Sequence, residues 1–361
     1  AKTKLRPSDK YLSDMELPSV SVCIPARNES ENLPGCLASI VDSDYPKLEI
    51  LVLDDCSQDK TSEIIKGFAH DGVRFVPGDA PKDDWLAKNQ AYQVLYEHAS
   101  GRILIFCGVD VRVGKDAIKK LVVTMLARHK QMISVMPKGV QKTAKARLLQ
   151  PMRYWWELAL PRRLFNRPPV LSTFWAIDKE TFKGLGTMKA VKGSVMPETY
   201  FAKSTSTHQD GYSFMRSNGG LDLTSTKPYV DQLQTSIRTR YPRLKSRIEN
   251  VLLMVCLELC MVVLPLVGLA VFGLWPSLLT QFLALAVIVV MMATHWMVVR
   301  AWGVANPVMA LVLLPASILS EAIITLVSMW RYEFAEVSWK DRNICIPAMR
   351  YYKKLPDIED N

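Results

Sequence analysis

Short apolar runs alternate with stretches of mixed polarity over the first 110 residues of this chain. Four runs rich in valine, isoleucine and leucine predict buried strands, at residues 20–24, 48–53, 73–76 and 103–109. The segments between them predict helices, at residues 31–40, 61–69 and 90–99. Strands and helices that alternate in this way specify an α/β fold with a mostly parallel sheet, in which ligands bind at the carboxyl ends of the strands.

The fourth run ends in a single carboxylate, Asp110. An unpaired carboxylate at the end of a buried strand is costly or loses its ionisation, so Asp110 needs a partner. A metal ion or a cation-bridged phosphate would supply one. The alternative is a local role, in which Asp110 caps the segment where Lys115 and Asp116 begin a helix.

Polar residues also follow the first two runs: Asn28 and Glu29 come after the first, and Asp54 and Asp55 after the second. Because the carboxyl ends of parallel strands face one crevice, this recurrence favours a ligand site. The alternative for the aspartates is a helix cap and turn ahead of Thr61.

The last third of the chain is almost uncharged. Between residues 251 and 329 the charged residues are Glu258, Arg300 and Glu321 alone. Three apolar segments, at about residues 251–274, 278–299 and 307–330, are each long enough to span a membrane. The third contains Pro315 and Glu321, which also fits a re-entrant segment.

Basic residues cluster beside this apolar region, and the formal net charge is +10. Such clustering favours an anionic membrane surface and anionic substrates over nucleic acid. The seven cysteines form no Cys-x-x-Cys pair, which argues against a disulfide framework or a zinc site. The basic residues before the first apolar segment predict a multi-pass protein of the cell membrane with its first part in the cytoplasm.

These patterns divide the chain into four parts. We expect a linker at residues 1–17, a soluble cytoplasmic domain at 18–247, a membrane region at 248–331 and a basic tail at 332–361. Residues 147–165 interleave arginines with aromatic and aliphatic side chains, which predicts an amphipathic helix in the membrane interface. The alternative for this segment is a core helix with a solvated arginine face.

Residues 21–59, with Pro25-Ala-Arg-Asn-Glu and Val-Leu-Asp54-Asp55-Cys-Ser-Gln-Asp59, resemble the opening of a family 2 glycosyltransferase. The resemblance implies the GT-A nucleotide-diphospho-sugar transferase fold and covers roughly residues 20–244. Trp85 and Lys88 are similar to the Gly-Trp-x-Gly-Lys segment of the ceramide glucosyltransferase-like, hopanoid-associated branch.

The resemblance implies a nucleotide-sugar donor site made of Pro25, Asn28, Glu29, Asp54, Asp55, Lys88 and Asp110. The family's fourth strand normally ends Asp-x-Asp, whereas this chain reads Gly108-Val-Asp110, so the first carboxylate is missing. The resemblance assigns Asp110 to the donor diphosphate and to Mg²⁺ or Mn²⁺. A single carboxylate implies a weakly held ion that takes its other oxygen ligands from the diphosphate and water.

Glu198 follows Pro197 where relatives carry Glu-Asp, of which the second residue is the general base. The resemblance therefore assigns removal of the acceptor proton to Glu198. The alternative is a carboxylate at a helix start after a proline. Residues 238–244 resemble the Arg-Thr-x-Tyr-x-x-Leu run of the hopanoid-associated branch, so that Arg238 or Arg240 would clamp the leaving diphosphate. Membrane topology alone also explains basic residues at this place.

Trp339-Lys340-Asp341-Arg342 resembles the Trp-Lys-Gly-Arg near the end of such enzymes, which favours a tail that meets the catalytic domain. Together these features predict an inverting glycosyltransferase with a nucleotide-sugar donor and a lipid or lipid-linked acceptor at the cytoplasmic membrane face. One rival is a processive polysaccharide synthase, disfavoured because the apolar segments carry few polar residues to line a channel. The other is a non-catalytic, degenerate scaffold, for which Gly108 and Pro197 are the evidence.

Overall fold

The computed structural model describes residues 16–140, 152–155, 157–159, 168–207, 211–217, 221–270, 278–302 and 307–352. The chain forms two compact units. Unit 1 comprises Ala1–Val140, Asn166–Lys227 and Trp339–Tyr351, and unit 2 comprises Gln141–Phe165, Pro228–Ser338 and Tyr352–Asn361. The expected catalytic domain ended at residue 247, whereas unit 1 ends its second stretch at Lys227 and regains part of the tail. Most of the expected linker, residues 1–15, lies outside the described residues.

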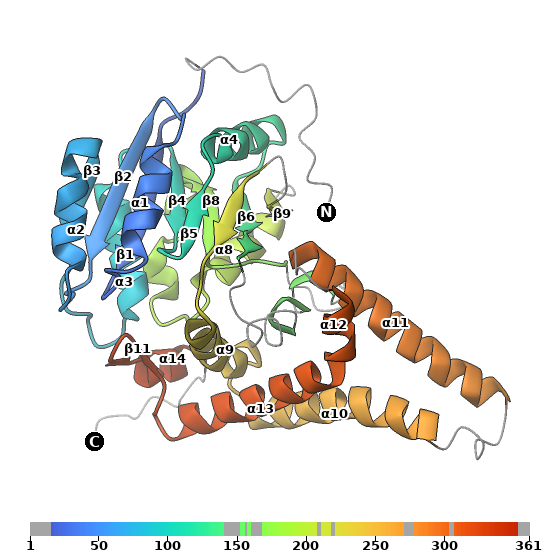
Figure 1. Cartoon of the computed structure of the whole chain (residues 1–361). Coiled ribbons are helices and arrows are strands. Elements are labelled where there is room, and N and C mark those ends of the chain that lie inside the picture. The colour runs from blue at the N-terminus through green and yellow to red at the C-terminus, as the bar shows by residue number, and fades with distance from the viewer. Residues whose placement is uncertain are drawn as a thin grey trace, which may run out of the picture. The chain divides into compact units, whose positions relative to one another are not determined.

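A seven-stranded sheet lies at the centre of unit 1, in the order β3-β2-β1-β4-β8-β6-β9 (Figure 1). Its strands are β1 (Val20–Ala26), β2 (Leu48–Asp54), β3 (Val73–Pro77), β4 (Ile103–Cys107), β6 (Met132–Met136), β8 (Phe174–Asp178) and β9 (Tyr212–Arg216). Neighbouring strands are parallel except where β8 pairs antiparallel with β4 and β6. The sheet is therefore mixed, with the mostly parallel half that the alternating pattern predicts.

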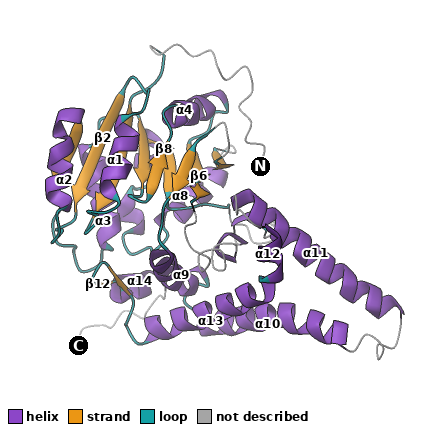
Figure 2. Cartoon of the chain, in the orientation of Figure 1, coloured by secondary structure: helices purple, strands orange, loops and turns teal. Residues whose placement is uncertain are grey.

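Helices accompany the sheet, as the pattern predicts (Figure 2). They are α1 (Leu33–Val41), α2 (Thr61–Gly67), α3 (Ala87–His98), α4 (Ala117–Ala127), α7 (Lys179–Gly184) and α8 (Pro197–Thr207), with 3₁₀ turns η2 (Phe68–Asp71) and η3 (Met188–Val191). The four predicted strands and three predicted helices are confirmed within a few residues. Apolar side chains on one face of β1 and β4, such as Val22, Ile24 and Ile105, are fully buried in one core cluster, and their burial stabilises these elements.

Two small sheets complete unit 1. One has the order β5-β10-β7, from β5 (Val111–Val113), β10 (Leu223–Ser225) and β7 (Lys138–Gly139). The other is a hairpin of β11 (Ser338–Trp339) and β12 (Arg342–Asn343), followed by α14 (Cys345–Tyr352). Residues 353–361 of the expected basic tail lie outside the described residues.

The described part of unit 2 is helical (Figure 2). It contains α9 (Tyr229–Arg243), α10 (Ile248–Ala270), α11 (Leu278–Trp302), α12 (Pro307–Val312) and α13 (Leu314–Glu333). α10 and α13 lie side by side (Figure 1). The third predicted apolar segment is interrupted, because Pro315 lies in the first turn of α13 and cannot donate a backbone hydrogen bond to a continuous helix.

One stretch of the described helices, Gln281–Ala301, is long and apolar enough to cross a membrane. Of the three expected spans, this one alone meets that measure among the described residues. Its helix also exposes large apolar side chains such as Leu278, Leu279 and Phe282. Exposed apolar surface of this kind marks an interaction site for a membrane or another protein.

The expected interfacial helix at residues 147–165 lies partly outside the described residues, which here are 152–155 and 157–159. Within them, Met152 is buried against Leu314 and Ile318 of α13. The indole Nε1 of Trp155 donates to Nδ1 of His295 on α11 at 3.0 Å. This packing against the helices of unit 2 fits the alternative of a core helix.

Candidate active site

Strand register brings three loops to one edge of the sheet in unit 1. Ala26, the last residue of β1, pairs with Asp54 of β2, and Asp54 pairs with Pro77 of β3. The loops that follow these three residues therefore start at the same level. This edge is where ligands bind in open α/β sheets.

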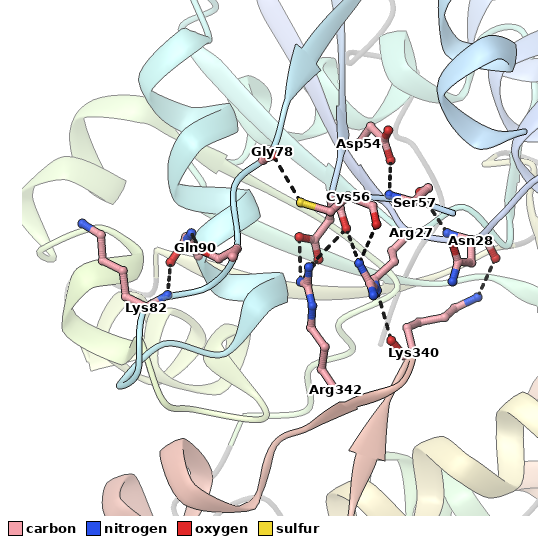
Figure 3. Close-up of polar contacts among 12 residues, drawn as sticks. Arg27, Asn28, Asp54, Cys56, Ser57, Gly78, Lys82, Gln90, Lys340 and Arg342 are labelled. Carbon is pink, nitrogen blue, oxygen red and sulfur yellow. Dashed lines mark hydrogen bonds and ion pairs between the residues drawn. The ribbon is translucent and has the colours of Figure 1, made fainter. Parts of the chain in front are cut away.

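Hydrogen bonds join the loop after β1 to the loop after β2 (Figure 3). The guanidinium of Arg27 donates from Nη1 to the backbone oxygens of Asp55 and Cys56, at 2.7 and 2.8 Å. Oδ1 of Asn28 accepts from the backbone of Gln58 at 2.8 Å. Asn28 and Cys56 have positive φ angles of 49° and 55°. Non-glycine residues rarely adopt this conformation, and such strain concentrates at functional sites.

Asp54 and Asp55 have different roles in this loop. Oδ1 of Asp54 accepts from the backbone N–H of Ser57 at 3.1 Å. This bond fits the alternative in which Asp54 stabilises a turn. Neither aspartate caps α2, since the backbone N–H of Thr61 bonds to Asp59. Asp55 is buried, and Nη1 of Arg342 lies 2.7 Å from each of its carboxylate oxygens. Burial raises the pKa of Asp55, while the hydrogen bonds and charge of Arg342 oppose that rise.

Arg342 belongs to the hairpin of β11 and β12, whose residues Ser338–Asn343 we call the C-terminal hairpin. Its Lys340 pairs with Glu29 at 2.9 Å and donates to the backbone oxygen of Asn28 at 3.0 Å. The backbone oxygen of Lys340 accepts from Nε of Arg27 at 3.0 Å (Figure 3). The expectation that this motif meets the catalytic domain is confirmed for the described residues.

Asp110 lies in the tight turn between β4 and β5. Its Oδ2 accepts from Oγ of Ser225 on β10 at 3.1 Å, and its backbone oxygen accepts from the N–H of Thr226 at 2.9 Å. α4 begins only at Ala117, so the alternative in which Asp110 caps that helix is wrong. Asp110 is half-buried, which leaves its carboxylate reachable by a ligand.

The metal expectation rests on Asp110. Among the described residues, no group of three or more His, Cys, Asp or Glu side chains is placed to hold a metal ion. A hard divalent cation can still bind one carboxylate together with diphosphate oxygens and water. A weakly held ion at Asp110 therefore stays a prediction.

Glu198 lies in the first turn of α8 directly after Pro197 and is buried. Its placement matches the helix-start alternative, which does not conflict with a role as a base. Burial raises the pKa of Tyr92 on α3, and the nearby Glu198 carboxylate adds to the rise. Nζ of Lys88 lies 5.4 Å from the centre of the Tyr92 ring.

Asn89, next to Lys88, holds the segment that leads to Glu198. Its buried Nδ2 lies 3.0, 3.0 and 2.8 Å from the backbone oxygens of Val191, Lys192 and Ser194. The backbone N–H of Leu86 also donates to Lys192, at 2.9 Å. The motif thus connects α3 to the approach of α8.

Arg238 and Arg240 belong to unit 2. Arg240 is almost fully buried, and its Nη2 donates to Oε2 of Glu321 on α13 at 3.0 Å. Nη2 of Arg238 donates to Oγ1 of Thr235 within α9 at 3.0 Å. The structure describes each unit by itself, so the clamp role of these arginines stays a prediction. Their contacts within unit 2 give Arg240 a structural role of its own.

Residues 21–186 match the family model described as Glycosyl transferase family 2. This segment of 166 residues is therefore similar to that family. The matched segment contains Asp54, Asp55, Lys88 and Asp110, whereas Glu198 and the C-terminal hairpin lie beyond the match.

Known proteins resemble parts of this chain. Glycosyltransferase AglE of Haloferax volcanii is 40% identical over 98 residues, which are 26% of this chain and 31% of that protein. A 4,4'-diaponeurosporenoate glycosyltransferase of Staphylococcus haemolyticus is 30% identical over 131 residues, 36% of this chain and 34% of that protein. The match thus spans about a third of these curated relatives.

The mannosyltransferase PcManGT of Pyrobaculum calidifontis, solved in complex with GDP-Man and Mn²⁺, is similar in structure. The TM-score is 0.51 at 15% sequence identity, over 92% of this chain and 90% of that chain. At this identity the likeness shows the fold alone, which is the GT-A α/β arrangement with a mixed sheet.

Several residues of this site escaped the sequence analysis as functional candidates: Arg27, Asn89, Ser225, Lys340 and Arg342. Arg27, Lys340 and Arg342 lie inside motifs that the sequence displays, and Asn89 directly follows one, so the motifs indicated the positions but not the roles. Ser225 has no such signal, because its contact with Asp110 arises from strand pairing between residues far apart in the sequence.

Proposed function

We propose that this protein is an inverting glycosyltransferase that moves a sugar from a nucleotide-diphospho-sugar to a hydroxyl group of a lipid or lipid-linked acceptor. The observation that carries the proposal is the gathering of Asp54, Asp55 and the strained loop residues at the carboxyl edge of the sheet, inside the segment that matches family 2. Fixed donors and carboxylates at this edge suit a nucleoside diphosphate.

In this mechanism the loops after β1 and β2 bind the nucleoside part of the donor, and Asp55 accepts from its N–H or O–H groups. Asp110 would hold Mg²⁺ or Mn²⁺, whose charge offsets that of the diphosphate. Glu198 takes the proton of the acceptor hydroxyl while its oxygen forms a bond to the anomeric carbon. The bond from that carbon to the diphosphate breaks on the opposite side, and the electron pair leaves with the nucleoside diphosphate.

The lipid acceptor is proposed from the apolar surface of unit 2. Gln281–Ala301 is apolar and mostly exposed, so a membrane location would cover it. A 4,4'-diaponeurosporenoate glycosyltransferase among the matched relatives agrees with a lipid acceptor. We propose that unit 1 lies in the cytoplasm, because basic residues such as Arg238 and Arg247 precede the apolar helices.

Transfer of labelled sugar tests this proposal. The full chain, purified in lipid nanodiscs, is incubated with a panel of labelled UDP- and GDP-sugars, Mn²⁺ and a total lipid extract, and label is counted in the organic phase. Glu198→Gln should abolish transfer, while Glu180→Gln, an exposed glutamate in the first turn of α7, should keep it. Nucleotide binding without transfer from any donor would contradict the proposal and favour a non-catalytic scaffold.

A further inference from the structure

The C-terminal hairpin is separated from the rest of unit 1 in the sequence. The chain leaves unit 1 at Lys227, forms the helices of unit 2 and returns at Trp339. It then contacts the loops after β1 and β2 rather than a remote face of the sheet. Arg342 bonds to Asp55, and Lys340 bonds to Glu29 and to the backbone of Asn28.

The backbone of this hairpin is strained. Lys340 and Asp341, the two residues that join β11 to β12, have φ angles of 48° and 65°. A two-residue turn with both φ angles positive favours asparagine, aspartate or glycine, and lysine fits it poorly. Asn28 and Cys56, in the two loops that the hairpin contacts, also have positive φ angles. Non-glycine residues with left-handed backbone therefore gather on both sides of one contact, as they do at ligand sites.

The contact of Arg342 with Asp55 is largely shielded from water. The side chains of Arg342 and Asp55 are only 18% and 4% exposed, so water screens the pair weakly. Arg27 bonds to the backbone oxygen of Asp55 while Arg342 bonds to its side chain, and together they fix both parts of the residue. An ionised carboxylate has about four lone-pair sites, so two bonds from Arg342 leave further sites for a ligand.

We propose that Arg342 and Lys340 are positioning residues of the donor site, which bind no sugar themselves but set the loops that receive a nucleoside diphosphate. Arg342 holds the Asp55 carboxylate in its orientation, and Lys340 orders Asn28 and Glu29. This inference rests on the proposed function. It makes the donor site depend on a segment that follows the apolar helices, so a chain cut before Trp339 would lack a complete donor site.

The positioning role of Arg342 should change the pH dependence of nucleotide binding. Asp55 faces Arg342 and Arg27, which favour its ionised form, and Asp54, which opposes it. Removing Arg342 raises the pKa of Asp55 further, because burial then acts with less opposition. As the pH is lowered, Asp55 should therefore become protonated, and nucleotide binding should weaken, at a higher pH in Arg342→Gln than in the wild type. A hairpin that only packs against the domain would not move this profile.

Calorimetric titration of the full chain in nanodiscs with UDP and with GDP tests the proposal. Arg342→Gln should weaken binding about 10-fold or more, the effect of leaving a buried carboxylate uncompensated. Lys340→Gln should weaken it by a smaller factor. The matched control is Arg102→Gln, since Arg102 forms an exposed ion pair with Asp178 at the amino end of β4. This control should bind like the wild type.

A double-mutant comparison isolates the pair. In an Asp55→Asn background, Arg342→Gln should change nucleotide binding far less than in the wild type. Unchanged or tighter binding in Arg342→Gln would overturn the proposal, since the arginine would then be structural or would compete with the ligand. Should Arg342→Gln not fold, Arg342→Lys, which keeps the charge and loses the planar fork, should still weaken binding, and wild-type affinity would overturn the proposal. A wild type that binds neither nucleotide would overturn the proposed function, and this inference with it.

Discussion

A β-carbon on Gly108 would lie 2.8 Å from Oδ1 of Asp110. The remaining carboxylate of the shortened motif therefore occupies space beside position 108, where the family pattern has its first aspartate. Its other oxygen, Oδ2, accepts from Ser225 at 3.1 Å. The first carboxylate of the motif is therefore absent at Gly108, and the second, Asp110, has an orientation fixed by Ser225.

Restoring the first aspartate should not restore a stronger metal site. In Gly108→Asp the new side chain must displace Asp110, because a contact of 2.8 Å is too short for a β-carbon. We expect donor turnover to fall rather than rise with little change in stability, because the atom that must move, Oδ1, is the end of the half-exposed Asp110 side chain. Thermal unfolding and nucleotide release measure both. Gly184→Asp, at an exposed position with open space, is the control, and a gain in turnover by Gly108→Asp would contradict this account.

Gly78 should be required in the donor loop. A β-carbon there would lie 2.6 Å from the backbone oxygen of Asp54 and 3.1 Å from Cα of Asp55. Gly78→Ala should therefore push the two aspartates and weaken nucleotide binding about 10-fold. Gly67→Ala meets nothing within 4 Å at the end of α2 and should be neutral or stabilise by up to about 1 kcal/mol. Equal nucleotide affinities in the two variants would rule out this role of Gly78.

Asn89 should determine the position of Glu198, the proposed base, because it holds the backbone of the segment that leads to Glu198. Asn89→Ala removes the donor shared by three backbone oxygens and should cost about 1–3 kcal/mol of stability. Asn89→Asp, which presents an acceptor to the same oxygens, should be worse. We expect sugar transfer to fall more than donor affinity, because the segment leads to Glu198. Donor affinity that falls in parallel with transfer would argue against that link.

Asp59 should make stability depend on acid pH. Desolvation by burial is the largest single effect and raises its pKa, but the hydrogen bonds from Thr61 and Ser30 together outweigh it and lower the pKa from an ordinary value of 3.8 to about 2. Because the folded-state pKa is the lower one, this stabilisation is present above about pH 4 and is lost as the pH falls towards 2. In that window the free energy of unfolding should fall less steeply in Asp59→Asn than in the wild type. Urea unfolding at a series of pH values measures this change of the free energy of unfolding with pH. The control Asp71→Asn, at an exposed position, should show the wild-type change. A wild-type change in Asp59→Asn would contradict the assignment.

Local patterns predicted much of the fold. The alternation of strand and helix placed β1 to β4, and polar residues at strand ends marked Asp54, Asp55 and Asp110. β6 was not predicted, because its five residues, four apolar and Ser134, are buried on both faces and carry no period that separates a strand from a helix. The antiparallel course of β8 was not predicted either, since pairing direction depends on partners far away in the sequence.

The contacts of the site were harder to predict than its members. Arg342 and Asp55 are 287 residues apart, and no local spacing indicates that they meet. The pairing of Arg240 with Glu321 depends in the same way on two helices that pack in unit 2. A basic motif beside an apolar segment has several explanations, and only the fold distinguishes them.

The most direct test of the central claim is release of nucleotide from UDP- and GDP-sugars by the wild type and by Asp110→Asn, each with Mn²⁺ and with a chelator. We predict that at least one donor is turned over by the wild type with Mn²⁺, that the chelator suppresses this, and that Asp110→Asn loses it while the protein stays folded. Full turnover by Asp110→Asn would contradict the assignment of the site, and no release from any donor by the wild type would contradict the proposed activity itself.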